Sequence, residues 1–156
     1  MQLYTKGGEN ILAQTKTYED VYNAFRWQIP EFYNIGVDIC DKWAEESNRL
    51  ALIYEENTGH VVRYTFRELK ILSNKLANGL QALNIGVGDR LGILLPQCPE
   101  TALSHIAAYK IGAVAIPLFT LFGTDALEYR LLNSESKGIV TDAANLPKII
   151  EIWENL

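Results

Sequence analysis

Residues 86–118 constrain the fold more than any other part of this 156-residue chain. Residues 91–95 are continuously apolar, as expected for a parallel strand that is covered on both faces. Pro96 ends that strand, and Pro99 opens a predicted helix that runs to Lys110 and stops at Gly112. Residues 113–118 form a second apolar strand. This order of strand, helix and strand predicts a parallel βαβ unit.

The residues before this block predict helices and a β-hairpin. Thr17 caps a helix over residues 17–25, and residues 34–46 read as a second helix. The segments 50–54 and 61–64 predict the hairpin, with Gly59 supplying a positive φ in its loop. A capping box over residues 65–68 then starts the most amphipathic helix of the chain. Its apolar positions recur every three or four residues: Phe66, Leu69, Leu72, Leu76, Leu80 and Leu83.

The residues after the block continue the alternation of helices and strands. Thr124 caps a helix to Asn133, and residues 138–142 form a short strand. Pro147 opens the last predicted helix. Two sets of apolar residues are expected to face inward on these helices: Leu127, Leu131 and Leu132, and then Ile149, Ile150 and Trp153. The fold class predicted is α/β: an open, mostly parallel Rossmann-like sheet with flanking helices, preceded by a β-hairpin and an N-terminal helical segment. Residues 1–16 are expected to be loosely ordered, and residues 17–156 to form one domain.

Composition excludes several classes of protein. The net charge of −5 leaves no basic excess for binding nucleic acid. No apolar stretch approaches the roughly 20 residues of a membrane span, and the start of the chain lacks the apolar core of a signal peptide. Cys40 and Cys98 are far apart and predict free thiols in a reducing compartment, so we expect a cytoplasmic protein without a membrane span. His60 and His105 are isolated, and no metal site is predicted.

One glycine motif does not predict a nucleotide site, whereas one loop is a candidate ligand site. The glycines of residues 86–92 are spaced G-x-G-x-x-x-G and precede a strand, so they cannot cradle a phosphate at a helix start. Residues 118–125 join the carboxyl end of a strand to a helix, where open α/β sheets bind ligands. The start of that helix could meet an anion. A packed loop whose apolar residues fill the core is the alternative interpretation.

Several sequence segments resemble those of the AMP-forming acyl-CoA synthetases, which are adenylate-forming enzymes. The segments occur in the same order and at similar spacing as in that family. Residues 25–44 are similar to the entry segment of the acetyl-CoA and medium-chain acyl-CoA synthetase branch. Residues 64–69 resemble the segment in which the family's hairpin leads into a helix. Residues 88–96 and 110–118 resemble the family's first Rossmann-like segment. The resemblance implies an enzyme that uses ATP and Mg²⁺ to convert a carboxylic acid to an acyl-adenylate and then transfers the acyl group to coenzyme A.

The resemblance also implies which residues touch cofactors. The loop that follows residues 113–118 lies beside the coenzyme A channel in the acetyl-CoA synthetase branch, which nominates Thr120 and Leu121. A basic residue after the next strand faces nucleotide phosphates there, which nominates Lys148. The phosphate loop, the adenine-binding motif and the catalytic lysine of the family all lie beyond Leu156, so no catalytic residue is assigned.

These observations predict that the chain is the N-terminal portion of an acid–CoA ligase. We expect this portion to be inactive alone, because the subdomains that it supports in the ligase are encoded beyond it. Surface that would face those subdomains is expected to make the fragment self-associate. The alternative is a self-contained α/β binding or interaction module without catalysis. A complete flavodoxin-like nucleotide binder would need a phosphate loop after its first strand, and residues 96–100 offer no glycine or hydroxyl cluster for one.

Overall fold

The computed structural model describes residues 17–26, 30–45 and 48–156, so the predicted loose segment 1–16 lies outside the described residues. The chain divides into two compact units, Met1–Phe32 and Tyr33–Leu156. The described part of the first unit contains one helix, α2 (Tyr18–Ala24). Thr17 caps this helix as predicted: its hydroxyl accepts from the Asp20 N–H, and the Asp20 carboxylate accepts from the Thr17 N–H, both at 3.2 Å.

The second unit alternates helices and strands in the predicted order. It begins with α3 (Ile35–Ile39), the 3₁₀ helix η1 (Asp41–Trp43), and the hairpin strands β1 (Leu50–Glu55) and β2 (Val61–Thr65). The alternating part then comprises α4 (Phe66–Ala82), β3 (Arg90–Leu94), α5 (Pro99–Lys110), β4 (Val114–Pro117), α6 (Thr124–Asn133), β5 (Ser136–Thr141), α7 (Leu146–Ile152) and the 3₁₀ helix η2 (Trp153–Asn155).

The predicted parallel sheet is confirmed. It has three strands in the order β4-β3-β5, and both pairings are parallel. Leu91 lies opposite Ala115 of β4 and Gly138 of β5. The hairpin strands β1 and β2 pair antiparallel in a sheet of their own. Successive parallel strands are connected by helices because a parallel pair cannot be joined by a tight turn.

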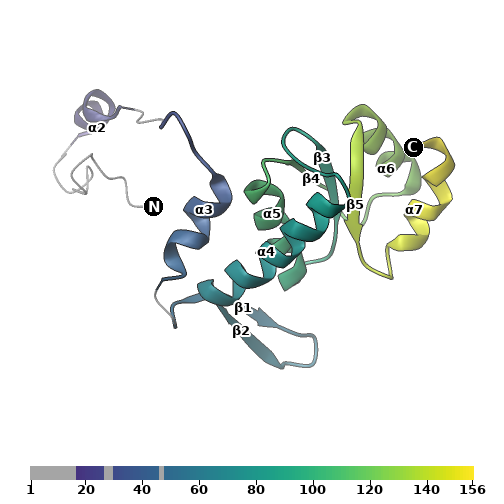
Figure 1. Ribbon diagram of the computed structural model, residues 1–156, viewed down its shortest axis with the longest axis horizontal. Helices are drawn as coiled ribbons and strands as arrows, with labels where there is room; N and C mark the ends of the chain where they lie inside the picture. The colour runs from purple at the N-terminus through teal and green to yellow at the C-terminus, as the bar shows by residue number, and fades with distance from the viewer. Residues whose placement is uncertain (1–16, 27–29, 46–47) are drawn as a thin grey trace. The chain divides into compact units, whose positions relative to one another are not determined.

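Helices cover the parallel sheet on both faces, with α4 and α5 on one side and α6 and α7 on the other (Figure 1). The apolar core is therefore divided by the sheet. One cluster joins α4, α5 and Leu91: Ala77, Leu80, Ile85, Leu91, Ala107, Ala108, Ile111 and Ala113. A second cluster joins α6, α7 and Leu94: Leu94, Leu118, Leu127, Leu131, Ile149 and Ile152. A third, smaller cluster joins Cys40 to Leu69 of α4 and Ile106 of α5. This double coverage explains why β3 is apolar at consecutive positions.

The turns and caps follow the local chemistry of the sequence. Gly59 and Gly112 adopt φ of 82° and 71°, a region that side chains with a Cβ rarely adopt. The predicted capping box is present: the Thr65 N–H donates to the Glu68 carboxylate at 2.7 Å, and the Glu68 N–H donates to the Thr65 hydroxyl at 3.2 Å. The Glu68 carboxylate also accepts from the Thr65 hydroxyl at 2.8 Å, and the two bonds from Thr65 to this carboxylate hold the pKa of Glu68 below its usual range.

Two predicted elements differ from the structure. The helix expected over residues 34–46 breaks at Cys40, whose φ of −128° is not helical, and continues as a 3₁₀ turn. Thr124 was expected as a cap, but Gly123 holds that position, and the Thr124 hydroxyl instead lies 3.3 Å from the Glu151 carboxylate.

Four apolar residues assigned by spacing to the inward faces of their helices are exposed instead. Leu127, Leu131 and Ile149 are buried as predicted. The exposed ones are Leu83, Leu132, Ile150 and Trp153. Ile152, rather than Ile150 or Trp153, completes the buried face of α7. Helical spacing shows which residues share an apolar face, but it does not show how much of that face another element covers. These four residues lie on faces that no described element covers fully.

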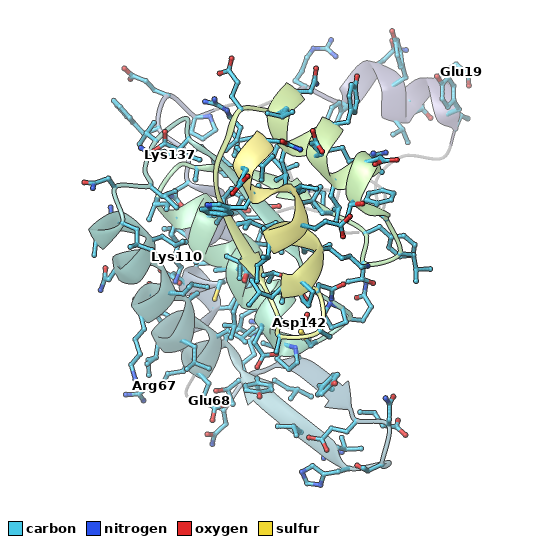
Figure 2. All side chains as sticks on the ribbon, turned by 90° about the vertical axis from the view of Figure 1, so that its right-hand side faces the viewer. Glu19, Arg67, Glu68, Lys110, Lys137 and Asp142 are labelled. Atoms are coloured by element: carbon cyan, nitrogen blue, oxygen red, sulfur yellow. The ribbon has the colours of Figure 1, made fainter. Side chains whose placement is uncertain are left out.

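A buried ammonium group ties α3, η1, α4 and α5 together. The side chain of Lys110 is 8% exposed and forms an ion pair of 2.7 Å with Asp41. Its Nζ also donates to the Ser73 hydroxyl at 2.8 Å and the Asn74 amide oxygen at 2.7 Å. The Asn34 side chain donates to the Lys110 carbonyl at 3.0 Å. The break at Cys40 is part of this arrangement, since Asp41, the next residue, pairs with Lys110, whose place in the fold is labelled in Figure 2.

We expect Lys110→Met to lower the free energy of unfolding by about 3 kcal/mol, because it leaves the carboxylate of Asp41 without its partner in a poorly hydrated site. Chemical denaturation followed by circular dichroism measures the effect. The matched control is Lys75→Met, at an exposed position of α4. Equal stability of the two variants would contradict a structural role for the Lys110 network.

Candidate functional site

The candidate site is the edge of the parallel sheet where β3, β4 and β5 end. Three loops leave this edge: residues 95–98 after β3, residues 118–123 after β4, and residues 142–145 after β5. Parallel strands deliver their carboxyl ends to one edge, and ligands of open α/β sheets bind there.

Lys148, on the first turn of α7, holds the loop after β4. Its Nζ donates to the Thr120 carbonyl at 2.6 Å and lies 3.4 Å from the Phe122 carbonyl. The structure thus brings together two of the three residues that the sequence nominated, Thr120 and Lys148. The contact runs through the backbone of Thr120. In this arrangement the ammonium group of Lys148 neutralises carbonyl dipoles of its own chain.

The side chains of the same loop present an apolar tip. Leu121 is 80% exposed and Phe119 59% exposed. Phe122 packs edge-on against Phe119, with ring centroids 6.0 Å apart, and the Arg130 guanidinium stacks over Phe122 at 4.1 Å. At this exposure Leu121 does not belong to the core. The alternative of a loop that only fills the core therefore does not describe Leu121.

The loop after β5 is closed by Asp142. One carboxylate oxygen of Asp142 accepts from both the backbone N–H and the side-chain amide of Asn145, each at 2.8 Å. These bonds to the charged form hold the pKa of Asp142 below its usual range. The neighbouring hydroxyl of Thr141 is buried and, among the described residues, has no hydrogen-bond partner. Neither residue was nominated from the sequence, although Asp three positions before Asn is a common turn signal.

The start of α6 is a poor site for an anion. The sequence suggested that its free N–H groups could meet one, but two carboxylates already lie there. Asp125 occupies the first turn, and Glu151 of α7 lies 3.3 Å from the Thr124 hydroxyl. Negative side chains near a helix N-terminus compensate its dipole, and they repel a phosphate.

The glycine-rich turn lies at the opposite edge of the sheet, as its spacing predicted. The Gly86 N–H donates to the Asp89 carboxylate and the Gly88 N–H to the Gly112 carbonyl, at 2.8 and 2.9 Å. These amides build the entry into β3. They are engaged within the protein, so the turn does not form a phosphate cradle.

In the part of the chain that the structure describes, the remaining titratable groups do not assemble into a catalytic centre. Burial raises the pKa of the Cys40 thiol, and burial lowers the pKa of His105. Cys40 and Cys98 are free cysteines. Within residues 17–26, 30–45 and 48–156, no three His, Cys, Asp or Glu side chains are grouped so as to hold a metal ion. In the same part of the chain, no helix has the length and apolar character needed to cross a membrane. The candidate site is therefore an edge whose loop after β4 is held by Lys148 and carries the exposed Leu121.

Comparison with known proteins identifies the family. The model of the AMP-binding enzymes matches residues 40–156, three quarters of the chain, so the chain belongs to the AMP-binding enzyme family. Over 139 residues it is 36% identical to the mitochondrial acyl-coenzyme A synthetase ACSM3 of Rattus norvegicus. Over 146 residues it is 36% identical to the acetyl-coenzyme A synthetase of Bacillus subtilis. The resemblance to acyl-CoA synthetases is thereby confirmed.

Solved structures confirm the fold. The acyl-CoA synthetase of Brucella canis superposes with a TM-score of 0.82 at 31% identity, over 88% of this chain and 27% of that one. A fatty acyl CoA synthetase of Mycobacterium tuberculosis superposes with a TM-score of 0.68 at 34% identity, over 77% of this chain and 23% of that one. The matches to the rat and Bacillus subtilis proteins cover 85% and 86% of this chain but only 24% and 25% of those proteins. The chain therefore spans about a quarter of the length of these relatives.

We expect Lys148→Met to loosen the loop after β4, because it removes a charge-assisted hydrogen bond to a loop carbonyl. The free energy of unfolding should fall by about 2 kcal/mol. Amide hydrogen exchange over residues 118–123 should accelerate more than exchange in β3. The control is Lys75→Met; equal exchange in the two variants would show that Lys148 does not hold the loop.

Proposed function

We propose that this chain is the N-terminal part of an AMP-forming acid–CoA ligase that activates a short- or medium-chain carboxylic acid. A carboxylate oxygen of the acid attacks the α-phosphorus of ATP, and the bond to pyrophosphate breaks, which gives an acyl-adenylate. The thiolate of coenzyme A then attacks the acyl carbon, and the bond to AMP breaks. Activation replaces a poor leaving group, the carboxylate oxygen, with AMP.

The observation that carries this proposal is the family match over residues 40–156, together with identities of 36% to an acyl-CoA and an acetyl-CoA synthetase. The described residues present a scaffold and a binding edge without a nucleophile paired to a base. For that reason we propose that activation of the acid requires the whole ligase and that the fragment alone is inactive. The described residues also lack a cluster that fits Mg²⁺, so no step is assigned to the metal here.

The proposed cofactor contacts are those of the loop after β4. Thr120 and Leu121 are proposed to line the approach of coenzyme A, which the 80% exposure of Leu121 favours. Lys148 is proposed to act mainly by holding this loop through the Thr120 carbonyl. To bind a nucleotide phosphate directly, the ammonium group of Lys148 would have to leave the carbonyls of Thr120 and Phe122.

The proposed domain organisation is a single N-terminal subdomain over residues 17–156, whose partners are the remaining subdomains of the ligase. The cytoplasm is proposed as the compartment, because free cysteines such as Cys40 and Cys98 are typical of reducing surroundings. A self-contained binding module is the second candidate function, and the apolar tip at Leu121 is the feature that favours it.

The 156-residue chain alone should give no acid-dependent exchange of pyrophosphate into ATP with acetate, butyrate or octanoate. The described residues contain no group that could activate the acid. An intact acetyl-coenzyme A synthetase serves as the positive control. Exchange above the background without acid would show that the chain is catalytic by itself.

A chimera tests the ligase assignment. Residues 40–156 replace the matching segment of the Bacillus subtilis acetyl-coenzyme A synthetase. We expect ATP-dependent formation of acetyl-CoA within about 100-fold of the parent, because imperfect contacts at the graft cost a few kcal/mol of activation free energy. A chimera that folds with the parent's thermal stability and forms no acetyl-CoA would favour the binding module instead.

A further inference from the structure

Two cationic side chains join the turns that lead into β3 and β5. Lys137 of β5 reaches the turn before β3, where its Nζ forms an ion pair of 2.8 Å with Asp89 and donates to the Asn84 carbonyl. Arg90 of β3 reaches the turn before β5, where its guanidinium donates to the carbonyl and the carboxylate of Glu135 at 2.9 and 2.8 Å. Together these contacts form a cross-strand clamp, in which each strand holds the turn that precedes the other.

The clamp acts on the two non-glycine residues of the described chain whose backbone is left-handed. Asn84 has a φ of 62° and Glu135 a φ of 48°. Residues with a Cβ adopt this region at a cost, and they keep it where their surroundings fix it. The carbonyl of each residue accepts a hydrogen bond from a cation of the clamp. The clamp therefore fixes two turns that local preference alone would leave in other conformations.

The clamp coincides with an irregularity in the pairing of β5 with β3. Arg90 lies opposite Ser136, but the next pair is Leu91 with Gly138. Two steps along β5 thus match one step along β3, and Lys137 is the extra residue of a bulge. Bulges are rare in parallel pairs, and they re-aim the side chain at the bulged position. Here the side chain of Lys137, which is 45% exposed, leaves the alternation of the strand and reaches the turn before β3.

The position opposite Leu91 accepts glycine but not lysine. A Cβ at Gly138 would lie 2.8 Å from the Ile85 side chain and 3.6 Å from the Leu91 side chain. Opposite residues of a parallel pair point to the same face of the sheet. Without the bulge, Lys137 would stand opposite Leu91 and carry its ammonium group into the apolar cluster that contains Leu91 and Ile85. Burial of an unpaired charge is costly, so the charge of Lys137 excludes the register without the bulge.

The register of β5 decides what its carboxyl end presents at the candidate site. A shift of one residue exchanges the two faces of a strand. Val140 packs against the cluster around Leu91, and Ile139 packs against the cluster around Leu94. In the register without the bulge these two side chains would change sides, and the end of β5 would move along β3 by about 3.3 Å, the rise of one residue. The turn that Asp142 closes would move with it.

We propose that the cross-strand clamp sets the register of β5 on β3 and thereby positions the loop after β5 at the candidate site. Lys137 near the start of β5 and Asp142 just past its end are both labelled in Figure 2. The clamp thus acts along the whole strand. Lys137 and Arg90 are positioning residues, since both lie at the edge where the strands begin. The proposal concerns the fold of this chain and does not rest on the proposed ligase function.

Nuclear magnetic resonance of the 156-residue chain tests the proposal through Lys137→Met. Methionine is similar in length to lysine, but it is uncharged and can enter an apolar face. We expect this variant to populate a second register, seen as exchange cross-peaks of the β5 amides and as a backbone NOE between Leu94 and Val140. The native pairing gives an NOE between Leu94 and Thr141. Amide hydrogen exchange over residues 138–141 should accelerate roughly tenfold, because a charge-assisted hydrogen bond is lost.

Lys137→Arg is the matched control, because it keeps a charge that cannot enter the apolar face and donors for Asp89 and the Asn84 carbonyl. It should show the native pairing alone. Arg90→Met removes the other arm of the clamp, and it should accelerate hydrogen exchange in β5 more than in β1. Circular dichroism checks that each variant is folded, which we expect because the side chains of Lys137 and Arg90 are 45% and 33% exposed.

Two outcomes would overturn the proposal. The first is a single, native register in Lys137→Met, whatever its rates of hydrogen exchange, since the register would then be set without the clamp. The second is an additional register in Lys137→Arg, since the charge at this position would then not exclude it.

Discussion

The burial of β3 is the constraint on which the second unit of this protein depends. Both edges of β3 are paired, to β4 and to β5, and both of its faces are covered by helices. Gly92, at its centre, leaves little room for a side chain: a Cβ there would lie 3.1 Å from a methyl group of Leu131 and 3.2 Å from Ile139, so both neighbours would have to shift. The positions of β4 and β5 follow from this strand, since α5 and α6 are crossovers that return the chain to one sheet, and α7 packs with α6 in the cluster around Leu94. The candidate site lies at this edge because parallel strands end together there.

The polar contacts of the structure serve mainly to fix the positions of these layers. Lys110 joins α5 to α4 and η1 through a buried ion pair, and Lys148 joins α7 to the loop after β4. Each lysine satisfies carbonyl, hydroxyl or carboxylate oxygens that would otherwise be poorly solvated. The loop after β4 is thereby fixed by a side chain of the helix α7. Among the described residues no nucleophile is paired with a base, and the chain covers about a quarter of the length of the rat and Bacillus subtilis relatives.

Local sequence signals predicted the regular elements well, and the reasons are visible at particular residues. The Thr65–Glu68 capping box, the stop at Gly112 and the apolar run of β3 depend on neighbours within a few positions, so they are readable along the chain. The break at Cys40 was not predicted, because it accompanies a contact between Asp41 and Lys110, 69 positions away. For the site, the sequence nominated Thr120, Leu121 and Lys148, and this assignment stays a prediction; the contact of Lys148 with the backbone carbonyl of Thr120 was not readable from the sequence.

The sequence by itself determined the fold class, the order of strands and helices and, through a family resemblance, the kind of enzyme. Periodicity and turn chemistry carry that information because they act over one or two turns of chain. Tertiary structure alone decided which apolar residues become core. Ile149 and Ile150 are adjacent and equally apolar, yet one is 1% exposed and the other 63%. The sheet ends at β5, so a side chain aimed beyond that edge finds no partner within the described chain, whatever its own hydrophobicity.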